Sequence, residues 1–509
     1  MKKTVYACLA TSLLSFASCV EPEDVLRGTN IEPEPVIEFP NLVTGTADFS
    51  TYVAVGNSLT SGFTDGALFI AAQENSFPNI LAQKFSLIGG GSFTQPLTND
   101  NFGGLALSGN RIQSPRLVTT GSTPQTLESV VGPLTVSTDI AINNPTGPFN
   151  NMGVPGAKSF HLLAPGYGNI NNLPALANPY FVRMTGDTPN ASVLDLTLQQ
   201  EPTFFSLWIG NNDILSFATS GGDDTNFITP VEGPAGIGFN ATYNAIIAGL
   251  TSRGAKGVIA NIPDITAIPH FTTVPYNAIT LNQATANQLN TGFELYNAGI
   301  IQAYAFLVQS SLITQEAANI EITKRTVNYV EGQNPILILD EDLTDLTSIN
   351  PQLISMRPAT ENDLFVLPAA SIIGTAISET QINGISIPLE DKWVLTPEEQ
   401  EAIAIATRAY NNTIATAAAS ANLALLDANT LLNELATTGI TSNNFTITSD
   451  LVTGGAFSLD GIHLTARGYA FISNEIMKAI DNTYNTNFEA SNNLLDIGTF
   501  PTNYSPTLQ

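Results

Sequence analysis

Four short apolar runs constrain the fold of this chain more than any other feature of its sequence. They are YVAVG (52–56), TFFSLWIG (203–210), GVIANIP (257–263) and LALLDA (423–428). None of them alternates with polar residues, which is typical of strands that are covered on both faces of a sheet. The four runs therefore predict buried strands.

Helical segments lie between these runs. NATYNAIIAGLTSRG (240–254) precedes the third run, and a longer segment (396–422) precedes the fourth. The longer segment begins with Thr396 as N-cap, Pro397 in the first turn and Glu399 to close a capping box. This alternation predicts an α/β fold, in which helices cover both faces of a parallel sheet.

Ligands of such sheets bind beyond the carboxyl ends of the strands, so the residues there are candidates for a site. Ser58 follows the first run, GNND (210–213) follows the second, and DGIHLT (460–465) lies on a loop before a final helix. A further stretch, NNMGVPGAKS (150–159), has two glycines where the backbone can approach a ligand closely.

These four stretches resemble the four sequence blocks of the SGNH, or GDSL, hydrolase superfamily, in the family's usual order. The Gly-Asp-Ser-Leu block corresponds to residues 56–59, the glycine block to 151–156, the Gly-x-Asn-Asp block to 210–213 and the Asp-x-x-His block to 460–463. The resemblance implies a three-layer, flavodoxin-like α/β fold with long insertions. It also implies a serine-dependent ester hydrolase, of the lipase, acylesterase or carbohydrate acetylesterase type.

A serine hydroxyl becomes a good nucleophile only when a neutral imidazole takes its proton and a further group orients that imidazole. His463 and Asp460 can do this for Ser58. They lie three positions apart on a tight loop, so the carboxylate can reach the ring nitrogen that faces away from the serine. The family resemblance implies the same catalytic triad.

The oxyanion of the reaction needs hydrogen-bond donors that are already in place. The resemblance assigns this role to the backbone N–H groups of Ser58 and Gly156 and to the side-chain amide of Asn212. Asp213 is expected to be a structural hydrogen-bond acceptor. Asn57 replaces the family's aspartate at a position outside the triad, and we expect activity to survive this change.

The chain has three histidines, and two of them lie outside the four blocks. His161 is expected to be structural, and His270, between a proline and a phenylalanine, is expected to pack in the interior or to make a loop hydrogen bond. The histidines lack a spacing such as His-x-x-x-His, which gives no support for a zinc site. We expect neither a metal nor another cofactor.

The N-terminal residues resemble a bacterial lipoprotein signal. Residues 1–18 contain two lysines, an apolar stretch and small residues before Cys19, which would be lipidated. The alternative is a plain secreted protein with a free cysteine. Residues 19–48 are rich in proline and glutamate, which predicts an acidic tether. This tether resembles the surface-export signals of Bacteroidetes lipoproteins, and a simple periplasmic spacer is the alternative.

Composition restricts the partners. The net charge is −27, from 17 basic and 44 acidic side chains, and such a chain repels nucleic acid. We expect the membrane to be reached through the N-terminal lipid, at the outer membrane of the cell envelope. The expected substrate is an ester of a small molecule, a lipid or an acetylated glycan.

We expect a hydrolase domain over 49–485, followed by a C-terminal tail over 486–509. Insertions near 88–148 and 275–395 are expected to build the pocket walls and to add small strands, and no motif in them selects a substrate. A second hypothesis is a non-catalytic surface lipoprotein that binds a glycan or a partner on the same fold. The hydrolase is favoured because five block residues are intact, namely Ser58, Gly156, Asn212, Asp460 and His463.

Replacement of Cys19 tests the predicted anchor. Several acyl chains on one cysteine, each contributing ~0.8 kcal/mol per buried CH₂, hold a protein on membranes far more firmly than one chain does. We expect the wild type to enter the detergent phase when cells are fractionated, and Cys19→Ala to stay unprocessed or to become soluble. Recovery of all processed wild type in the aqueous phase would indicate free secretion instead.

Overall fold

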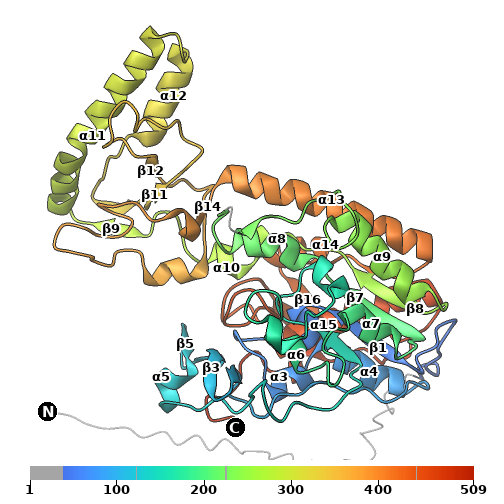
Figure 1. The fold of residues 1–509 in the computed structure, drawn as a ribbon. Coiled ribbons are helices and arrows are strands. Elements are labelled where there is room, and N and C mark those ends of the chain that lie inside the picture. Colours follow the sequence, from blue (N-terminus) through green and yellow to red (C-terminus); the bar gives the residue numbers. More distant parts are fainter. Residues whose placement is uncertain (1–37, 122, 224–225, 443) are drawn as a thin grey trace, which may run out of the picture. The chain divides into compact units, whose positions relative to one another are not determined.

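The computed structural model describes residues 38–121, 123–223, 226–442 and 444–509 (Figure 1). Its contacts divide the chain into one unit of residues 1–41 and another of residues 42–509, and the fold described below belongs to the second. The predicted signal peptide, Cys19 and most of the predicted tether lie outside the described residues. Within the described part, no helix combines the length and the apolar character needed to cross a membrane.

A five-stranded parallel sheet lies at the centre of the second unit. Its strands, in sheet order, are β6 (Asn151–Gly153), β1 (Tyr52–Gly56), β7 (Phe204–Trp208), β8 (Lys256–Ala260) and β15 (Ala424–Leu426). Numbered along the chain, the order is 2-1-3-4-5, which is one of the two common orders of doubly wound sheets. All four predicted runs are strands, and the predicted parallel sheet is confirmed.

The strand β6 is the part of this sheet that the apolar pattern does not predict. It has only three residues, Asn-Met-Gly, and pairs with β1 so that Asn151 lies opposite Ala54. The side chain of Asn151 is buried and donates to the carbonyl of Thr60 at 3.0 Å. A short strand with a buried amide carries no hydrophobic run, so its sequence is typical of a loop.

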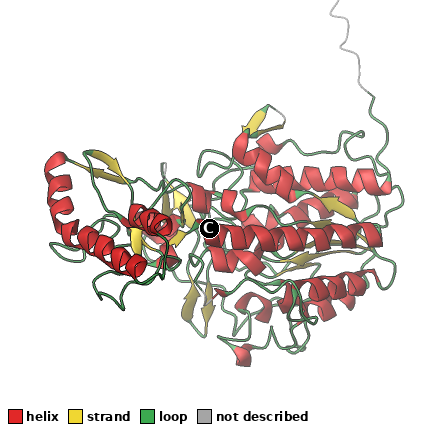
Figure 2. Ribbon diagram, turned by 90° about the horizontal axis from the view of Figure 1, so that it is seen from above, coloured by secondary structure: helices red, strands yellow, loops and turns green. Residues whose placement is uncertain are grey.

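Helices cover both faces of the sheet, as predicted (Figure 2). α4 (Phe77–Ser86) packs against α15 (Ala466–Tyr484), and α9 (Phe239–Thr251) packs against α13 (Pro397–Ala421). The predicted capping box of α13 is present, because the N–H of Thr396 donates to Oε2 of Glu399 at 2.6 Å.

Aromatic side chains fill the core near the amino ends of the strands. Phe49 stacks on Phe85 with ring centroids 4.1 Å apart, and its ring lies 4.7 Å from that of Phe204. The chain joins this core before residue 49, since the N–H of Thr46 donates to the carbonyl of Tyr484 at 2.8 Å. The carboxyl ends of the strands lie at the opposite end of the sheet, away from this aromatic core, and are available for a site.

The 88–148 insertion and the predicted C-terminal tail pack against each other. The 88–148 insertion forms two small antiparallel hairpins, β2–β3 (Leu105–Leu107 with Asn110–Gln113) and β4–β5 (Leu117–Thr119 with Pro124–Thr126). Arg116, which is fully buried, donates to the carbonyl of Ser505 at 2.6 Å. Tyr504 meets the ring of Phe69 edge-on at 5.0 Å. The predicted tail is therefore part of the folded unit.

The 275–395 insertion contains more helix than the sequence pattern predicts. It holds α11 (Gln283–Gln309), a helix of 27 residues, and α12 (Gln315–Arg325). Among the expected small strands, β11 (Leu337–Leu339) forms and pairs with β12 (Met356–Pro358). α11 is hard to predict because its buried residues form a narrow stripe at helical spacing among amide-rich exposed positions.

Candidate active site

The candidate residues lie at the carboxyl ends of three neighbouring strands. Ser58 opens the short helix α2 (Ser58–Ser61) after β1, and Asn212 lies in the first turn of α8 (Asn211–Ala218) after β7. Gly156 follows β6. β1 lies between β6 and β7, where the chain's direction of winding reverses. That position is where doubly wound sheets bind their ligands.

Ser58, His463 and Asp460 form one chain of hydrogen bonds. Nε2 of His463 lies 2.8 Å from Oγ of Ser58, and Nδ1 of His463 lies 2.8 Å from Oδ2 of Asp460. The histidine and the aspartate come from the loop before α15, as the sequence predicts. In this geometry one ring nitrogen faces the hydroxyl and the other is held by the carboxylate.

Asp460 is fixed by several donors. Its Oδ1 accepts from the N–H groups of Ile462 and His463, both at 2.9 Å, and from the hydroxyl of Ser458 at 3.0 Å. Its Oδ2 also accepts from the N–H of Gly66 at 2.8 Å. Burial alone would raise the pKa of Asp460, but the charge and hydrogen bonds of His463, together with the backbone donors, hold it well below its usual range. The carboxylate therefore stays ionised.

The three predicted oxyanion donors line one open cavity, of about 880 Å³ including space open to solvent, together with Ser58 Oγ and His463. The backbone N–H groups in the first turn of a helix have no acceptor within that helix. Ser58 is the first residue of α2, so its N–H has no acceptor within the helix. Gly156 adopts a φ of +79°, which favours glycine, and its backbone is exposed to the cavity. Nδ2 of Asn212 donates to the carbonyl of Ala157 at 2.9 Å, which leaves its second N–H for a ligand.

Asn57 and Asp213 hold the surrounding loops. The side chain of Asn57 caps α2 by accepting from the N–H of Leu59 at 3.0 Å. Asp213 is fully buried and accepts from the N–H of Ser159 at 2.8 Å and from its hydroxyl at 2.6 Å. Asp213 therefore joins α8 to the segment that follows Gly156, which is a structural role.

The other two histidines lie apart from the hydrogen-bonded chain. Nδ1 of His161 accepts from the N–H of Lys158 at 3.0 Å, and its ring stacks on Tyr167 with centroids 4.5 Å apart. Burial, and then the charge of Lys158, lower the pKa of His161 to about 4, which keeps it neutral. His270 is buried, and its backbone N–H donates to the carbonyl of Gly461 at 3.0 Å. It therefore supports the loop that carries His463.

Ser58 and His463 also line a second cavity, which is almost wholly apolar. It has a volume of about 800 Å³, including space open to solvent. Its walls include Ile265, Ile268, Leu432, Leu435, Phe471 and Ile472. Neither cavity is lined by a residue of 275–395, all of which the structure describes, and only Gln113 comes from 88–148. The expectation that the insertions build most of the pocket walls is therefore wrong for these two cavities.

Three residues behind Asp460 were missed by sequence reasoning. Ser458 lies in the same turn, SLDG, where a serine two positions before an aspartate is a recognisable turn signal. Asp65 and Gly66 form a turn-type pair, but nothing in the sequence connects them with residue 460. The N–H of Asp65 donates to the hydroxyl of Ser458 at 3.0 Å.

Asp65 is a second buried carboxyl group close to the hydrogen-bonded chain. It is 1% exposed, and its Oδ1 accepts from the N–H of Leu459 at 3.1 Å. Burial raises the pKa of Asp65 to about 7, with a further increase from the charge of Asp460, while the Leu459 bond and Arg116 act in the opposite direction.

Comparisons of this chain with protein-family models, with curated proteins and with solved structures find no match. Any inference about function therefore rests on the geometry of the site. The fold and the site define a doubly wound α/β chain with a serine, a histidine and an aspartate joined by hydrogen bonds at the ends of its central strands.

Asp65→Asn tests the buried carboxyl group. Below a pH of about 3.9 the carboxyl group of Asp65 is protonated in both the folded and the unfolded chain. As the pH rises from there toward the raised pKa of the folded state, this group loses its proton only in the unfolded chain, which favours unfolding. We expect Asn, which keeps the shape and the acceptor, to increase the melting temperature relative to wild type more at pH 8 than at pH 4. An equal difference at the two pH values would contradict the raised pKa.

Proposed function

We propose that this chain is a serine-dependent ester hydrolase of the SGNH, or GDSL, type, with Ser58 as the nucleophile. The observation that carries the proposal is the pair of 2.8 Å contacts that His463 makes with Ser58 and with Asp460. The 2-1-3-4-5 strand order, which is that of flavodoxin-like sheets, supports the fold that the family resemblance implies. We place the enzyme at the cell envelope, where the N-terminal sequence predicts a lipid anchor.

In the proposed acylation step, Oγ of Ser58 attacks the ester carbonyl carbon while Nε2 of His463 takes the hydroxyl proton. Asp460 orients the ring and stabilises the imidazolium. The carbonyl oxygen becomes an oxyanion that accepts hydrogen bonds from Ser58, Gly156 and Asn212, and each such donor typically stabilises the transition state by about 3 to 4 kcal/mol. The bond to the alcohol oxygen then breaks, and that oxygen receives the proton from Nε2.

The acyl group is then carried on Oγ of Ser58. A water molecule gives a proton to Nε2 of His463 and its oxygen attacks the acyl carbon. Collapse of this second intermediate breaks the bond to Oγ, which takes the proton back from Nε2, and the carboxylic acid leaves. The ionised Asp460 keeps the ring in the same orientation through both steps.

The apolar cavity beside Ser58 supports an apolar acyl chain as the preferred substrate group. Apart from His463, the described residues that line it carry no titratable side chain. Each methylene buried there contributes ~0.8 kcal/mol, whereas an acetyl group has no methylene to bury. This favours a lipase or acylesterase over a carbohydrate acetylesterase. The open, more polar cavity, which Ser58 also lines, suits the alcohol part of the ester.

Ser58→Ala tests the nucleophile. We expect the wild type to be labelled by a fluorophosphonate probe and to hydrolyse p-nitrophenyl esters, and the variant to lose both properties while it melts like wild type. The alanine removes only Oγ. Labelling or turnover at the wild-type level in a folded variant would favour the non-catalytic lipoprotein, or another nucleophile.

Histidine variants provide the matched comparison for that experiment. His463→Ala removes the proposed base, and we expect turnover to fall by a factor of about 10³ or more. His161→Ala removes a neutral ring outside both cavities, and we expect most of the activity to remain. Equal losses in the two variants would overturn the assignment of the base.

Leu432→Trp tests the acyl cavity. Leu432 lies on α14 (Ala428–Thr437), lines the cavity and is buried. A larger ring there should exclude several methylenes of a long chain, so we expect kcat/KM for p-nitrophenyl decanoate to fall at least about tenfold, with little change for the acetate ester. Asn433→Trp, at the next and exposed position, is the control. A parallel loss on both esters would argue against an acyl site.

A further inference from the structure

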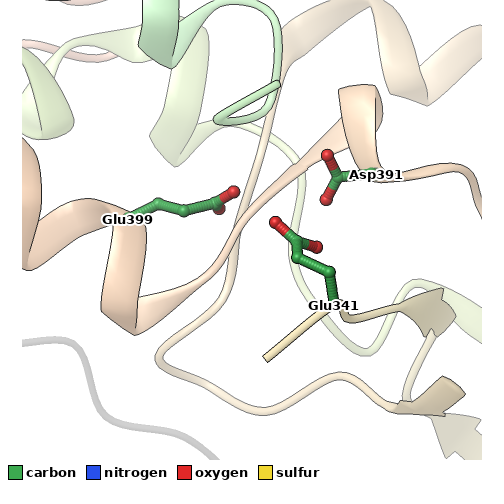
Figure 3. Close-up of side chains that lie close together, drawn as sticks. All are labelled: Glu341, Asp391 and Glu399. Carbon is green, nitrogen blue, oxygen red and sulfur yellow. The ribbon is translucent and has the colours of Figure 1, made fainter. Parts of the chain in front are cut away.

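A cluster of three carboxylates lies outside both cavities that contact Ser58. Glu341 follows β11, Asp391 begins the 3₁₀ turn of Asp391–Trp393, and Glu399 lies in the first turn of α13. Figure 3 shows the three side chains converging from these separate segments. One carboxylate oxygen of each lies within 4.8 Å of the other two.

Glu399 contributes a buried oxygen that has no hydrogen-bond partner. The residue is only 7% exposed. Oε2 is used by the capping box, because it accepts from the N–H of Thr396 at 2.6 Å and from its hydroxyl at 2.9 Å. Oε1 has no donor among the described residues, and the carboxylate points toward Glu341 and Asp391 (Figure 3). A buried carboxylate oxygen without a donor is unfavourable unless a cation or a proton satisfies it.

A glycine turn closes the cluster on another side. A Cβ atom on Gly222, which has a φ of +80°, would lie 1.8 Å from Oε1 of Glu399. A Cβ atom on Gly221 would lie 2.3 Å from the carbonyl oxygen of Asp391. The turn that follows α8 thus lies directly against two of the three acidic residues, and any larger residue would disturb the arrangement.

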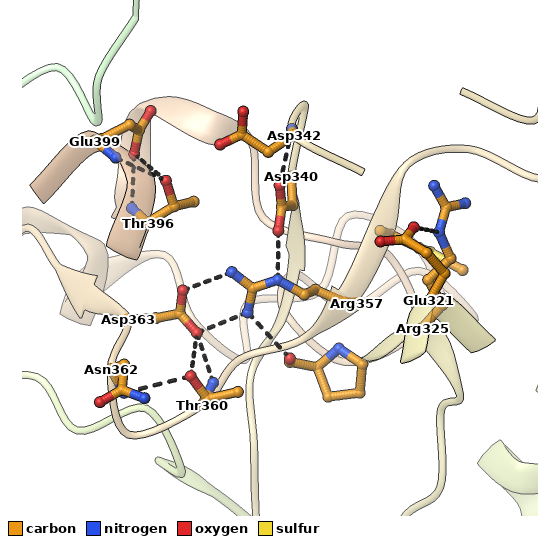
Figure 4. A network of polar contacts seen from close by, with 12 residues as sticks. Glu321, Arg325, Asp340, Asp342, Arg357, Thr360, Asn362, Asp363, Thr396 and Glu399 are labelled. Atoms are coloured by element: carbon orange, nitrogen blue, oxygen red, sulfur yellow. Dashed lines mark hydrogen bonds and ion pairs between the residues drawn. The ribbon is translucent and has the colours of Figure 1, made fainter. Parts of the chain in front are cut away.

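The nearby cations are paired elsewhere. Figure 4 shows Arg357 between two other acids: its Nη1 and Nη2 each donate to Asp363 at 2.7 Å, and its Nε pairs with Asp340. Lys392 pairs with Glu390. Within the described ranges, no ion pair involves a member of the cluster. Oδ1 of Asp391 is likewise buried without a hydrogen-bond partner in this part of the chain.

We propose that Glu341, Asp391 and Glu399 bind a calcium ion. Carboxylate oxygens are the ligands of hard cations, whereas zinc and copper sites use histidine or cysteine, which the cluster lacks. Mg²⁺ usually keeps several waters and is held by one or two carboxylates, whereas Ca²⁺ takes several carboxylate oxygens directly. The three carboxylates of the cluster therefore suit calcium. Water completes the coordination.

The bound ion would have a structural role that is independent of the proposed hydrolase. It would join the 275–395 insertion, through Glu341, to the start of α13, through Glu399. Because the glycine turn after α8 lies against the same residues, the end of α8 would be held as well. We therefore expect calcium to act on the stability of the fold, with no role in bond cleavage.

Calcium binding is measured on the full chain, first treated with EDTA and dialysed. We expect isothermal titration calorimetry to detect about one Ca²⁺ per chain and millimolar CaCl₂ to raise the melting temperature, with a weaker effect of MgCl₂. Absence of both a heat signal and a melting shift with Ca²⁺ would show that the cluster is satisfied by protons, and the proposal would be wrong.

Two variants and a matched control locate the ion. Glu341→Gln changes an exposed residue, and Glu399→Gln keeps a side chain that suits a capping box. Each should weaken Ca²⁺ binding at least about tenfold and remove the melting shift, while the calcium-free protein melts no lower because a repulsive charge is gone. Glu379→Gln removes an exposed charge elsewhere in the insertion and should respond to Ca²⁺ like wild type. A wild-type response in the Glu341 and Glu399 variants would overturn the assignment.

Discussion

The common direction of the strands β6, β1 and β7 is the constraint on which the candidate site depends. Because the three strands are parallel neighbours, their carboxyl ends meet at one edge, and this brings Gly156, Ser58 and Asn212 to a single cavity. Their side chains and backbone groups then need only short turns to reach their positions. The histidine and the aspartate arrive differently, on a loop more than 400 residues after the serine. Hydrogen bonds from the N–H groups of Asp65 and Gly66 fasten that loop to the segment that follows α2.

Buried carboxylates in this molecule differ in the hydrogen-bond donors and cations around them. Asp460 receives enough donors to stay ionised, and Asp363 shares a bidentate contact with Arg357. Asp65 has fewer compensating contacts, so that burial favours its neutral form. Glu399 is the extreme case, with one oxygen in a helix cap and the other left without a donor. The same chemical group therefore has different protonation behaviour according to how many donors the fold directs at it.

The sequence was informative where a pattern is local. The apolar runs predicted four of the five central strands, and Thr396 with Glu399 predicted the start of α13. The sequence blocks identify Ser58, Asp460 and His463 as site residues, and the structure brings them together, although their catalytic role stays a prediction. β6 was missed because three residues with a buried amide have no periodicity, and α11 because its apolar stripe is narrow. The carboxylate cluster was missed because Glu341 lies 50 positions before Asp391, and only tertiary structure joins them.

The placement of the 275–395 insertion also affects how the sheet can be completed. β15 pairs with β8, with Ala424 opposite Val258, and the whole insertion together with α13 separates these two partners. Until that long connection has closed, β8 is an edge strand with unpaired N–H and C=O groups and an apolar surface. Contacts across such a separation form slowly, because the loop must close before the pairing stabilises it. Pairing of the last strand therefore closes a loop that contains the whole insertion, so the length of the insertion adds to the entropy cost of completing the sheet.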